Sequence, residues 1–236
     1  MKQKKIEKFF IQPSWPAPPF IKAYTTLRES GVSRPPENRL DRTQLISQFN
    51  LPNEPIWLRQ THSDIVLPAT IENREKEADA SFSEQPNQVC LIQTADCLPI
   101  LLCHKEGKQI AAIHAGWRGL TKSIISKTLA VLKYRANDFL AWIGPCISQD
   151  HYEVGSEVRS AFIQMDSENQ HNFIPSINQR WLANLPAIAT LQLKNAGIHH
   201  IYGGNICTYT NDKQFFSYRR DGAGTGRIVS MIWISE

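Results

Sequence analysis

The sequence predicts an α+β protein in which a mixed β-sheet is covered by helices. Apolar and β-branched runs bounded by turn residues outnumber the amphipathic helical stretches, and the two kinds of segment do not alternate regularly. Regular alternation would instead favour a parallel α/β sheet. The chain has 236 residues, 42% of them hydrophobic, which is enough to bury a sizeable core.

No linker, repeat or low-complexity run divides the chain, so we expect one domain over residues 1–236. Prolines at 13, 16, 18 and 19 predict that residues 1–19 form an irregular N-terminal segment. The early apolar run Phe9–Ile11 is shorter than the about 7–15 residues of a secretory signal. No apolar stretch is long and continuous enough to span a bilayer.

Eight segments are predicted to be strands, because their apolar residues lie between turn residues. In chain order they are Phe20–Thr26, Ile56–Gln60, Val89–Thr94, Leu98–Cys103, Gln109–His114, Leu140–Ile143, His200–Tyr202 and Ile228–Ile234. Lys105–Lys108 separates two of these strands and predicts a β-hairpin.

Three helices are predicted from apolar residues at helical spacing. They cover Leu120–Leu132, Val154–Gln164 and Leu182–Asn195. Pro186 suits the first turn of the third helix, where its missing N–H costs little, and Gly197 ends that helix.

Charge and cysteine content restrict the class of protein. The net charge of +4 is modest, and no basic stripe is interleaved with aromatic residues, so no nucleic-acid partner is expected. The five cysteines are odd in number and contain no Cys-x-x-Cys pair, which favours a reducing compartment over disulfides or a zinc knuckle. Together these features predict a cytoplasmic protein without a membrane partner.

The segment Thr94–Pro99 places a polar Asp96–Cys97 pair in an otherwise apolar region. A free cysteine is usually a small buried hydrophobe, and this interpretation suits Cys90 and Cys103. Cys97 differs because it lies between two predicted strands and beside a carboxylate. We therefore treat it as a candidate for chemistry.

The segment His114–Gly119 combines a strand end, two glycines and the start of an amphipathic helix. Such a junction directs backbone N–H groups and the positive end of a helix at one point. The guanidinium of Arg118 matches phosphate or carboxylate. An anion site and a structural turn with a buried Trp117 both remain open.

Two further segments carry polar residues whose role the sequence leaves open. His62 has polar neighbours on both sides, as a surface or hydrogen-bonded histidine does, and its position does not place it near Cys97. Arg219 and Arg220 precede a glycine-rich loop and could contact a phosphate or a ribose-bearing ligand. A charged surface turn is the commoner role of such a pair.

Eight motifs occur in an order that resembles one family. They are Gln60–His62, Ala78–Ala80, Thr94–Ile100, His114–Gly119, Ile143–Ile147, Tyr152–Val154, Cys207–Thr208 and Ser217–Arg220. This order is similar to that of the YfiH family of laccase-domain proteins, variously described as multicopper polyphenol oxidoreductase, peptidoglycan editing factor and purine nucleoside phosphorylase. The resemblance covers about residues 20–235. Its most specific parts are Ala-Asp-Cys-Leu-Pro and His-Ala-Gly-Trp-Arg-Gly.

The resemblance implies an α/β/β/α layered sandwich with mixed β-sheets, of the CNF/YfiH-like type. It also implies a metal held by His62, Cys97 and His114. Three protein ligands leave a fourth position open, which is the coordination of a catalytic Zn²⁺, with Cu²⁺ as the alternative ion. A water in that position, with a pKa near 7, could attack C6 of adenosine and deaminate it.

The resemblance further implies phosphorolysis of adenosine, inosine and methylthioadenosine, with purine nucleosides and phosphate as partners of a monomer or homodimer. Phosphorolysis needs an anion cradle near C1′, for which Arg118 with the helix N-terminus is our candidate. The predicted catalytic residues are Cys97, His114 and Asp96, and the predicted substrate- and phosphate-binding residues are Gln60, Arg118, Arg219 and Arg220.

Two other enzyme classes stay open. A cysteine hydrolase or amidase acting on peptidoglycan precursors would use Cys97 as nucleophile and His114 as base. A copper polyphenol oxidase would need many histidines, typically in His-x-His pairs, whereas the chain has seven histidines and no such pair.

The chain departs from the family pattern in three places. Residues 25–33 lack the usual paired glycines, residues 34–45 are shortened, and Leu185–Ala189 replaces a more polar stretch of the third helix. These departures concern the rim of the predicted site, and hence substrate preference. They do not affect the predicted metal ligands.

Overall fold

The computed structural model describes residues 9–34 and 39–236. Part of the predicted irregular segment, residues 1–8, and part of the shortened segment, residues 35–38, therefore lie outside the described residues. In the described part of residues 1–19, Phe10–Ile11 forms a short strand, β1, that pairs with Thr25 and Thr26.

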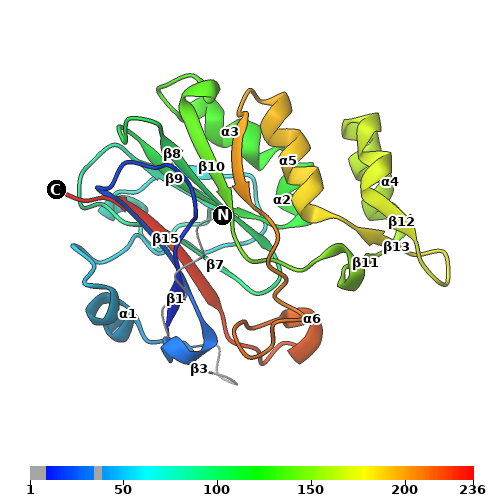
Figure 1. The fold of residues 1–236 in the computed structure, drawn as a ribbon, viewed down its shortest axis with the longest axis horizontal. Coiled ribbons are helices and arrows are strands. Elements are labelled where there is room, and N and C mark those ends of the chain that lie inside the picture. The colour runs from blue at the N-terminus through cyan, green and yellow to red at the C-terminus, as the bar shows by residue number, and fades with distance from the viewer. Residues whose placement is uncertain (1–8, 35–38) are drawn as a thin grey trace.

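Two β-sheets form the centre of the protein (Figure 1). The four-stranded sheet is antiparallel and has the order β1 (Phe10–Ile11), β2 (Ile21–Thr26), β15 (Ile228–Ile234), β7 (Cys90–Thr94). The six-stranded sheet has the order β14 (His200–Gly203), β10 (Phe139–Ile143), β8 (Leu98–His104), β9 (Ile110–Ala115), β6 (Ala80–Ser83), β5 (Val66–Pro68). This second sheet is mixed, because β10–β14 and β5–β6 are parallel and its other pairs antiparallel.

The remaining elements are short sheets and helices. The small sheets are β11 (Glu153–Val154), β13 (Trp181–Ala183), β12 (Phe173–Pro175), in that order, and β3 (Ser33–Arg34) with β4 (Arg39–Leu40). The α-helices are α1 (Arg42–Phe49), α2 (Trp117–Thr121), α3 (Ile124–Val131), α4 (Ser156–Met165), α5 (Leu185–Asn195) and α6 (Tyr218–Asp221). The 3₁₀ helices are η1 (Arg28–Ser30), η2 (Ile71–Asn73), η3 (Ala136–Asp138), η4 (Gln149–His151) and η5 (Ser167–Asn172).

Successive side chains of a strand point to opposite faces, and among the described residues the buried hydrophobic side chains form three clusters. In β8, Ile100 and Leu102 pack toward the helices, whereas Leu101 packs into the space between the two sheets. In β15, Ile232 faces the other sheet, whereas Met231 packs with α1.

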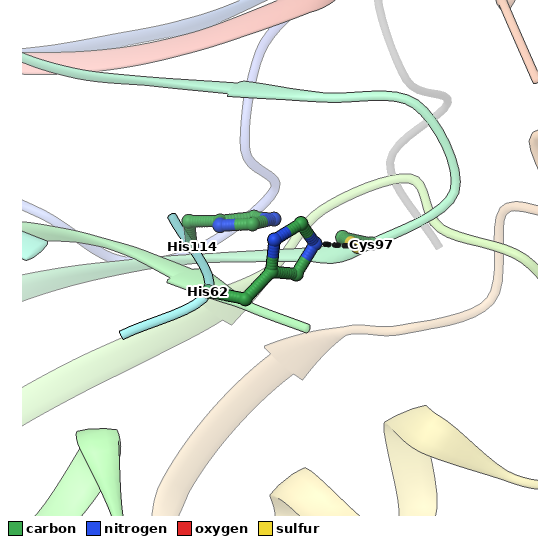
Figure 2. A group of neighbouring side chains, drawn as sticks. All are labelled: His62, Cys97 and His114. Carbon is green, nitrogen blue, oxygen red and sulfur yellow. Dashed lines mark hydrogen bonds between the residues drawn. The ribbon is translucent and has the colours of Figure 1, made fainter. Parts of the chain in front are cut away.

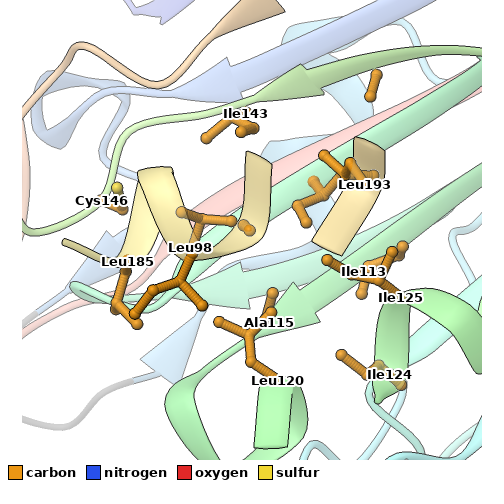
Figure 3. Close-up of a cluster of buried hydrophobic side chains, with 14 of the residues drawn as sticks. Leu98, Ile113, Ala115, Leu120, Ile124, Ile125, Ile143, Cys146, Leu185 and Leu193 are labelled. Carbon is orange, nitrogen blue, oxygen red and sulfur yellow. The ribbon is translucent and has the colours of Figure 1, made fainter. Parts of the chain in front are cut away.

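The resulting order of layers is α/β/β/α, as the resemblance implied. Helices α3 and α5 cover the six-stranded sheet through the cluster in Figure 3, and α1 lies on the far side of the four-stranded sheet (Figure 1).

Seven of the eight predicted strands are confirmed with small shifts at their ends, as β2, β7, β8, β9, β10, β14 and β15. The hairpin turn is also confirmed: the Gly107 N–H donates to the carbonyl of His104 at 2.7 Å, and Gly107 has φ 72°. The predicted strand Ile56–Gln60 is wrong. Ile56 bridges to Cys90 and Arg59 to Glu77, so the segment changes partner before any ladder forms.

Each of the three predicted helices begins at a different residue from the one predicted, and the first is interrupted in its interior. The predicted helix Leu120–Leu132 is two helices, α2 and α3, because Ser123 has φ 65° and interrupts the ladder. Val154 lies in β11, so the second helix begins at Ser156. The third begins at Leu185, because residues 181–183 form β13.

The details predicted for the third helix are confirmed. Pro186 occupies its first turn, and Gly197, with φ 95°, follows its end. None of the helices in the described part of the chain combines the length and apolar character needed to cross a bilayer.

Candidate metal centre

One thiol and two imidazoles from distant segments meet at one end of the six-stranded sheet (Figure 2). His62 lies in the loop before β5, Cys97 in the turn between β7 and β8, and His114 near the end of β9. Their ligand atoms all lie within 4.8 Å of one another, and Cys97 Sγ is 3.7 Å from His62 Nε2. Zn–S and Zn–N bonds of about 2.3 and 2.1 Å require a similar clustering of donors, so this set suits a metal ion.

The hairpin register explains why two of the three residues converge. Leu98 pairs with Ala115 at the open end of the β8–β9 hairpin, so the preceding Cys97 and the neighbouring His114 lie at the same end. His62 comes from a different part of the chain. Its approach depends on tertiary contacts rather than on the register.

Gly116 provides the space in which these groups approach one another. A Cβ at this position would lie 2.8 Å from His62 Cδ2 and 3.2 Å from Cys97 Sγ. Gly116 has φ −69°, which any residue adopts. Glycine at this junction therefore provides space for the site and is not required by the shape of a turn.

Asp79 is the main polar residue that sequence reasoning missed. Its fully buried carboxylate lies 2.7 Å from His114 Nδ1 and accepts hydrogen bonds from the backbone N–H groups of Thr61, His62 and Ser63. The Ser63 hydroxyl also donates to it, at 2.6 Å. The motif Ala78–Ala80 marked the position, but nothing in its spacing gave this carboxylate a role.

The charges of this cluster are strongly coupled. Burial raises the pKa of Asp79, but hydrogen bonds from His114 and Ser63 outweigh it and lower the value to about 2. Burial also raises the pKa of Cys97, yet His114 and His62 together bring it below its ordinary value. Burial lowers the pKa of His114, but Cys97 and Asp79 raise it above its ordinary value. The cluster therefore favours a thiolate, which is the form that binds metals and acts as a nucleophile.

A cavity of about 560 Å³ adjoins the three candidate ligands. It is lined by Leu58, Gln60, His62, Gln93, Thr94, Ala95, Asp96, Cys97, His114, Arg118, Ile147, Tyr152, Leu185, Tyr218, Arg219 and Arg227. Its volume is typical of small-molecule sites, which range from about 300 to 1,000 Å³. Most of its lining residues are polar or charged, and Leu58, Ala95, Ile147 and Leu185 are apolar.

Two of the predicted anion-binding residues, Arg118 and Arg219, line this cavity. Arg118 is exposed, and its guanidinium lies 4.6 Å from the centre of the Trp117 ring. Arg219 donates to the carbonyl of Glu153 at 3.0 Å and lies 5.3 Å from the Tyr152 ring. Helix α2 has only five residues, so its N-terminus adds little to the anion site that we predicted there.

Arg220 does not line the cavity, contrary to its predicted role in substrate binding. Its guanidinium donates to the carbonyls of Thr208, Tyr209 and Phe215 and to both carboxylate oxygens of Asp221. These contacts occupy its donors within the protein. Arg220 therefore stabilises the C-terminal segment.

Asp96 and Gln60 line the cavity, but their polar atoms have protein partners. The buried Asp96 carboxylate accepts hydrogen bonds from the Thr208 and Ser217 hydroxyls and from the backbone N–H of Arg219. The Gln60 amide exchanges two hydrogen bonds with the backbone of Gln93. Their catalytic and purine-binding roles stay predictions, while these contacts show that both residues position the cavity wall.

Several other lining residues were not predicted. Tyr152, Tyr218 and Arg227 contribute two aromatic rings and a guanidinium to the cavity, and Ile147 and Leu185 contribute apolar surface. Tyr152, Ile147 and Tyr218 belong to motifs that carried the family resemblance, and Leu185 belongs to a stretch that we placed at the rim of the site. Arg227 lies outside these motifs.

Comparison with known proteins finds matches over most of the chain, under two different descriptions. Residues 34–235 match the family model described as multi-copper polyphenol oxidoreductase laccase. A Shigella flexneri protein named purine nucleoside phosphorylase YfiH is 41% identical over 240 residues, covering 95% of this chain and 98% of that protein. A Haemophilus influenzae protein named purine nucleoside phosphorylase is also 41% identical, covering 94% and 98%.

Solved structures share the fold. Neisseria meningitidis protein NMB0706 superposes with a TM-score of 0.90 at 39% identity, covering 97% of this chain and 100% of that chain. YlmD from Geobacillus stearothermophilus superposes with a TM-score of 0.88 at 23% identity, which supports the fold alone.

Proposed function

The chain belongs to the YfiH family of laccase-domain proteins, and from this membership we propose that it is a zinc-dependent purine nucleoside phosphorylase. The proposed substrates are adenosine, inosine and methylthioadenosine, and deamination of adenosine is proposed as a second activity. The observation that carries the proposal is the position of the His62–Cys97–His114 cluster beside a cavity of about 560 Å³, large enough for a nucleoside.

The donor set suits zinc. One thiolate and two imidazoles are common zinc ligands, and three protein ligands are typical of catalytic rather than structural sites. In this proposal His62, Cys97 and His114 hold the ion, and Asp79 keeps the proton of His114 at Nδ1, so that Nε2 is free to bind. When bound, zinc supplies a Lewis acid at the wall of the cavity.

Phosphorolysis places two demands on the rest of the cavity. A phosphate oxygen attacks C1′ while the bond from C1′ to the base nitrogen breaks, and the base leaves with the bonding electrons and takes up a proton. Arg118 and Arg219 offer guanidinium groups for the phosphate, which they suit by geometry and charge. Leu58, Ile147 and Leu185 offer apolar surface that excludes water around the base.

The direct test is an assay of purified, zinc-loaded protein with inorganic phosphate and each of the three nucleosides. We expect release of free base with ribose 1-phosphate from adenosine and inosine, and with 5-methylthioribose 1-phosphate from methylthioadenosine. The Cys97→Ala variant should release none. Release of base at the same rate by Cys97→Ala would overturn the proposed site. Inosine formed from adenosine without phosphate would support the deaminase activity.

A second candidate, a cysteine hydrolase, is favoured by one observation. Asp79 contacts His114, and His114 in turn interacts with Cys97, in the order of an acid, a base and a nucleophile. His62 has no part in such a triad, whereas it completes a metal site. Metal analysis separates the two: a metal-free, active protein that iodoacetamide inactivates at Cys97 would support the hydrolase.

The oxidase named in the family description is less well supported by the site. Among the described residues, His62–Cys97–His114 is the single group of three or more His, Cys, Asp or Glu residues placed to hold a metal ion. Several coppers would need several such groups. Oxidation of a phenol at enzymatic rates by copper-loaded protein would revive this alternative.

A further inference from the structure

One buried carboxylate, that of Asp79, touches both segments that carry the imidazole groups of the candidate metal centre. Asp79 has no exposed surface, and it directly precedes β6, where Ala80 pairs with Ile113 of β9. Its own backbone is fixed on both sides, because its N–H donates to Ile65 and its carbonyl accepts from His114. The carboxylate is therefore held at a defined point between the two histidines.

Toward His114, the carboxylate selects a tautomer. Asp79 Oδ1 lies 2.7 Å from His114 Nδ1, and a carboxylate can only accept, so Nδ1 carries a proton. The ring nitrogen left for an ion is Nε2. His114 is 4% exposed, so bulk water does not offer an equivalent partner on this side of the ring.

Toward His62, the same carboxylate organises a turn. The consecutive N–H groups of Thr61, His62 and Ser63 all donate to Asp79, at 3.2, 3.1 and 2.6 Å. Successive N–H groups that converge on one anion are the defining feature of a nest. His62 has φ 59°, a left-handed conformation that is costly for a non-glycine residue. The three hydrogen bonds stabilise that conformation and so direct the His62 ring toward Cys97 (Figure 2).

We propose that Asp79 is a positioning residue that orients both imidazole ligands of the metal centre at once, by fixing the tautomer of His114 and the backbone turn of His62. This inference rests on the metal centre in the proposed function. Partners of this kind that lie behind the ligands commonly contribute a factor of 10–100 to metal affinity.

The main variant is Asp79→Asn, which preserves size but not chemistry. An amide has one oxygen and one NH₂ group, so in either orientation it faces the His62 turn or His114 with a donor where an acceptor is needed. Ser63→Ala is a milder second variant, which removes only the hydroxyl that donates to Asp79 at 2.6 Å. The matched control is Asp221→Asn, which alters another carboxylate with several hydrogen bonds, distant from the three ligands in sequence and absent from the cavity lining.

Three measurements apply to each variant: zinc affinity by chelator competition, the visible spectrum of the cobalt-substituted protein, and the melting temperature without metal. We expect Asp79→Asn to bind zinc about 10- to 100-fold more weakly and to change the thiolate and d–d bands of cobalt. The zinc-loaded wild type should show a downfield, slowly exchanging His114 Nδ1 proton by NMR, which Asp79→Asn should shift upfield. Ser63→Ala should bind zinc about two- to fivefold more weakly, and Asp221→Asn should melt lower with zinc affinity unchanged.

Zinc affinity within twofold of wild type in Asp79→Asn, with an unchanged cobalt spectrum, would overturn the inference. An equal loss of affinity in Asp221→Asn would overturn it too, because general destabilisation would then be the cause. If Asp79→Asn does not fold, unchanged affinity in Ser63→Ala decides against the inference. Wild-type protein that binds zinc but does not cleave nucleosides would refute the proposed function. The zinc affinities of the variants would still decide this inference. Wild-type protein that binds no zinc would remove both.

Discussion

At the scale of single residues, the candidate metal centre depends on unusual backbone conformations. His62 and Asp96, one a candidate ligand and the other adjacent to Cys97, have φ values of 59° and 85°. Such conformations cost roughly 1–2 kcal/mol for residues with a Cβ and persist where other contacts compensate. Asp79 supplies those contacts at His62, and Thr208, Ser217 and Arg219 supply them at Asp96.

The first prediction concerns Gly116→Ala. The added Cβ would come within 2.8 Å of His62 and displace its ring, so we expect zinc affinity to fall at least about tenfold. Because Gly116 has φ −69°, the backbone accepts alanine, and the melting temperature without metal should change little. Chelator competition and thermal unfolding measure the two effects. Zinc affinity equal to that of wild type would contradict the packing around Gly116.

The second prediction compares two adjacent arginines. Arg219→Ala should raise the KM for phosphate about tenfold with little loss of stability, because Arg219 lines the cavity and is exposed. Arg220→Ala should leave that KM unchanged but lower the free energy of unfolding by about 2 kcal/mol or more. The Thr208 and Tyr209 carbonyls would lose the donor that Arg220 supplies, and the Phe215 carbonyl and Asp221 would each keep only their other donors, such as Arg28. Steady-state kinetics and urea unfolding give the two values. A raised KM in Arg220→Ala alone would reverse the assignment.

At the scale of elements, the junction after β9 differs most from its prediction. The apolar spacing from Leu120 to Leu132 is continuous, yet Ser123 separates α2 from α3 with φ 65° and ψ 37°. Both helices still bury residues of the same stripe, including Leu120, Ile124 and Ile125 (Figure 3). The apolar pattern therefore records which face is buried, but it does not record a break in the helix axis.

The third prediction tests that break. Glycine adopts the left-handed region without a Cβ penalty, so Ser123→Gly should raise the free energy of unfolding by roughly 0.5–1 kcal/mol. The Ser123 side chain makes no cap hydrogen bond that the substitution would remove. Urea unfolding measures the change, and Ser123→Ala serves as the control, since it keeps the Cβ and should show no gain. A loss of stability in Ser123→Gly would argue for one continuous helix in solution.

At the scale of the whole molecule, segments far apart in the chain are fixed against one another by buried contacts. The β15 strand pairs with β2 and β7 and thereby joins the C-terminal part of the chain to its N-terminal part. Beside it, Asp221 accepts from Arg28 and Arg220, so α6, which carries Arg219, is held against the segment after β2. The part of the cavity wall that Arg219 lines therefore depends on contacts between the C-terminal and N-terminal parts of the chain.

The fourth prediction concerns acid stability and this contact. A hydrogen bond and charge from Arg220 lower the pKa of Asp221 to about 2, against partial burial. Because the folded pKa lies below the unfolded value of about 3.9, the contribution is complete above that value and is lost as the pH falls toward 2. Asp221→Asn should thus be less stable than wild type by roughly 1–2 kcal/mol at pH 6, with the difference shrinking below about pH 4. Urea unfolding at several pH values measures it. A difference that does not depend on pH would contradict this assignment.

Much of the fold was predictable from local pattern. Six of the seven confirmed strands have five or more residues, and in β8 and β9 the hairpin turn set the register that places Cys97 beside His114. Strand β6, Ala80–Ser83, was missed because its small and polar residues resemble a loop, and it becomes a strand only by pairing between β5 and β9.

The sequence by itself determined the positions of the main strands along the chain, the buried face of the first predicted helix, and the motifs that placed the chain in its family. Only the tertiary structure decided that Asp79 links His62 to His114, that Arg219 lines the cavity while Arg220 does not, and that Gly116 is needed for space. The physical reason is the distance along the chain over which each effect acts. Periodicity and turn chemistry act between neighbours in the chain, whereas a metal site joins side chains whose distances are set by the packing of two sheets.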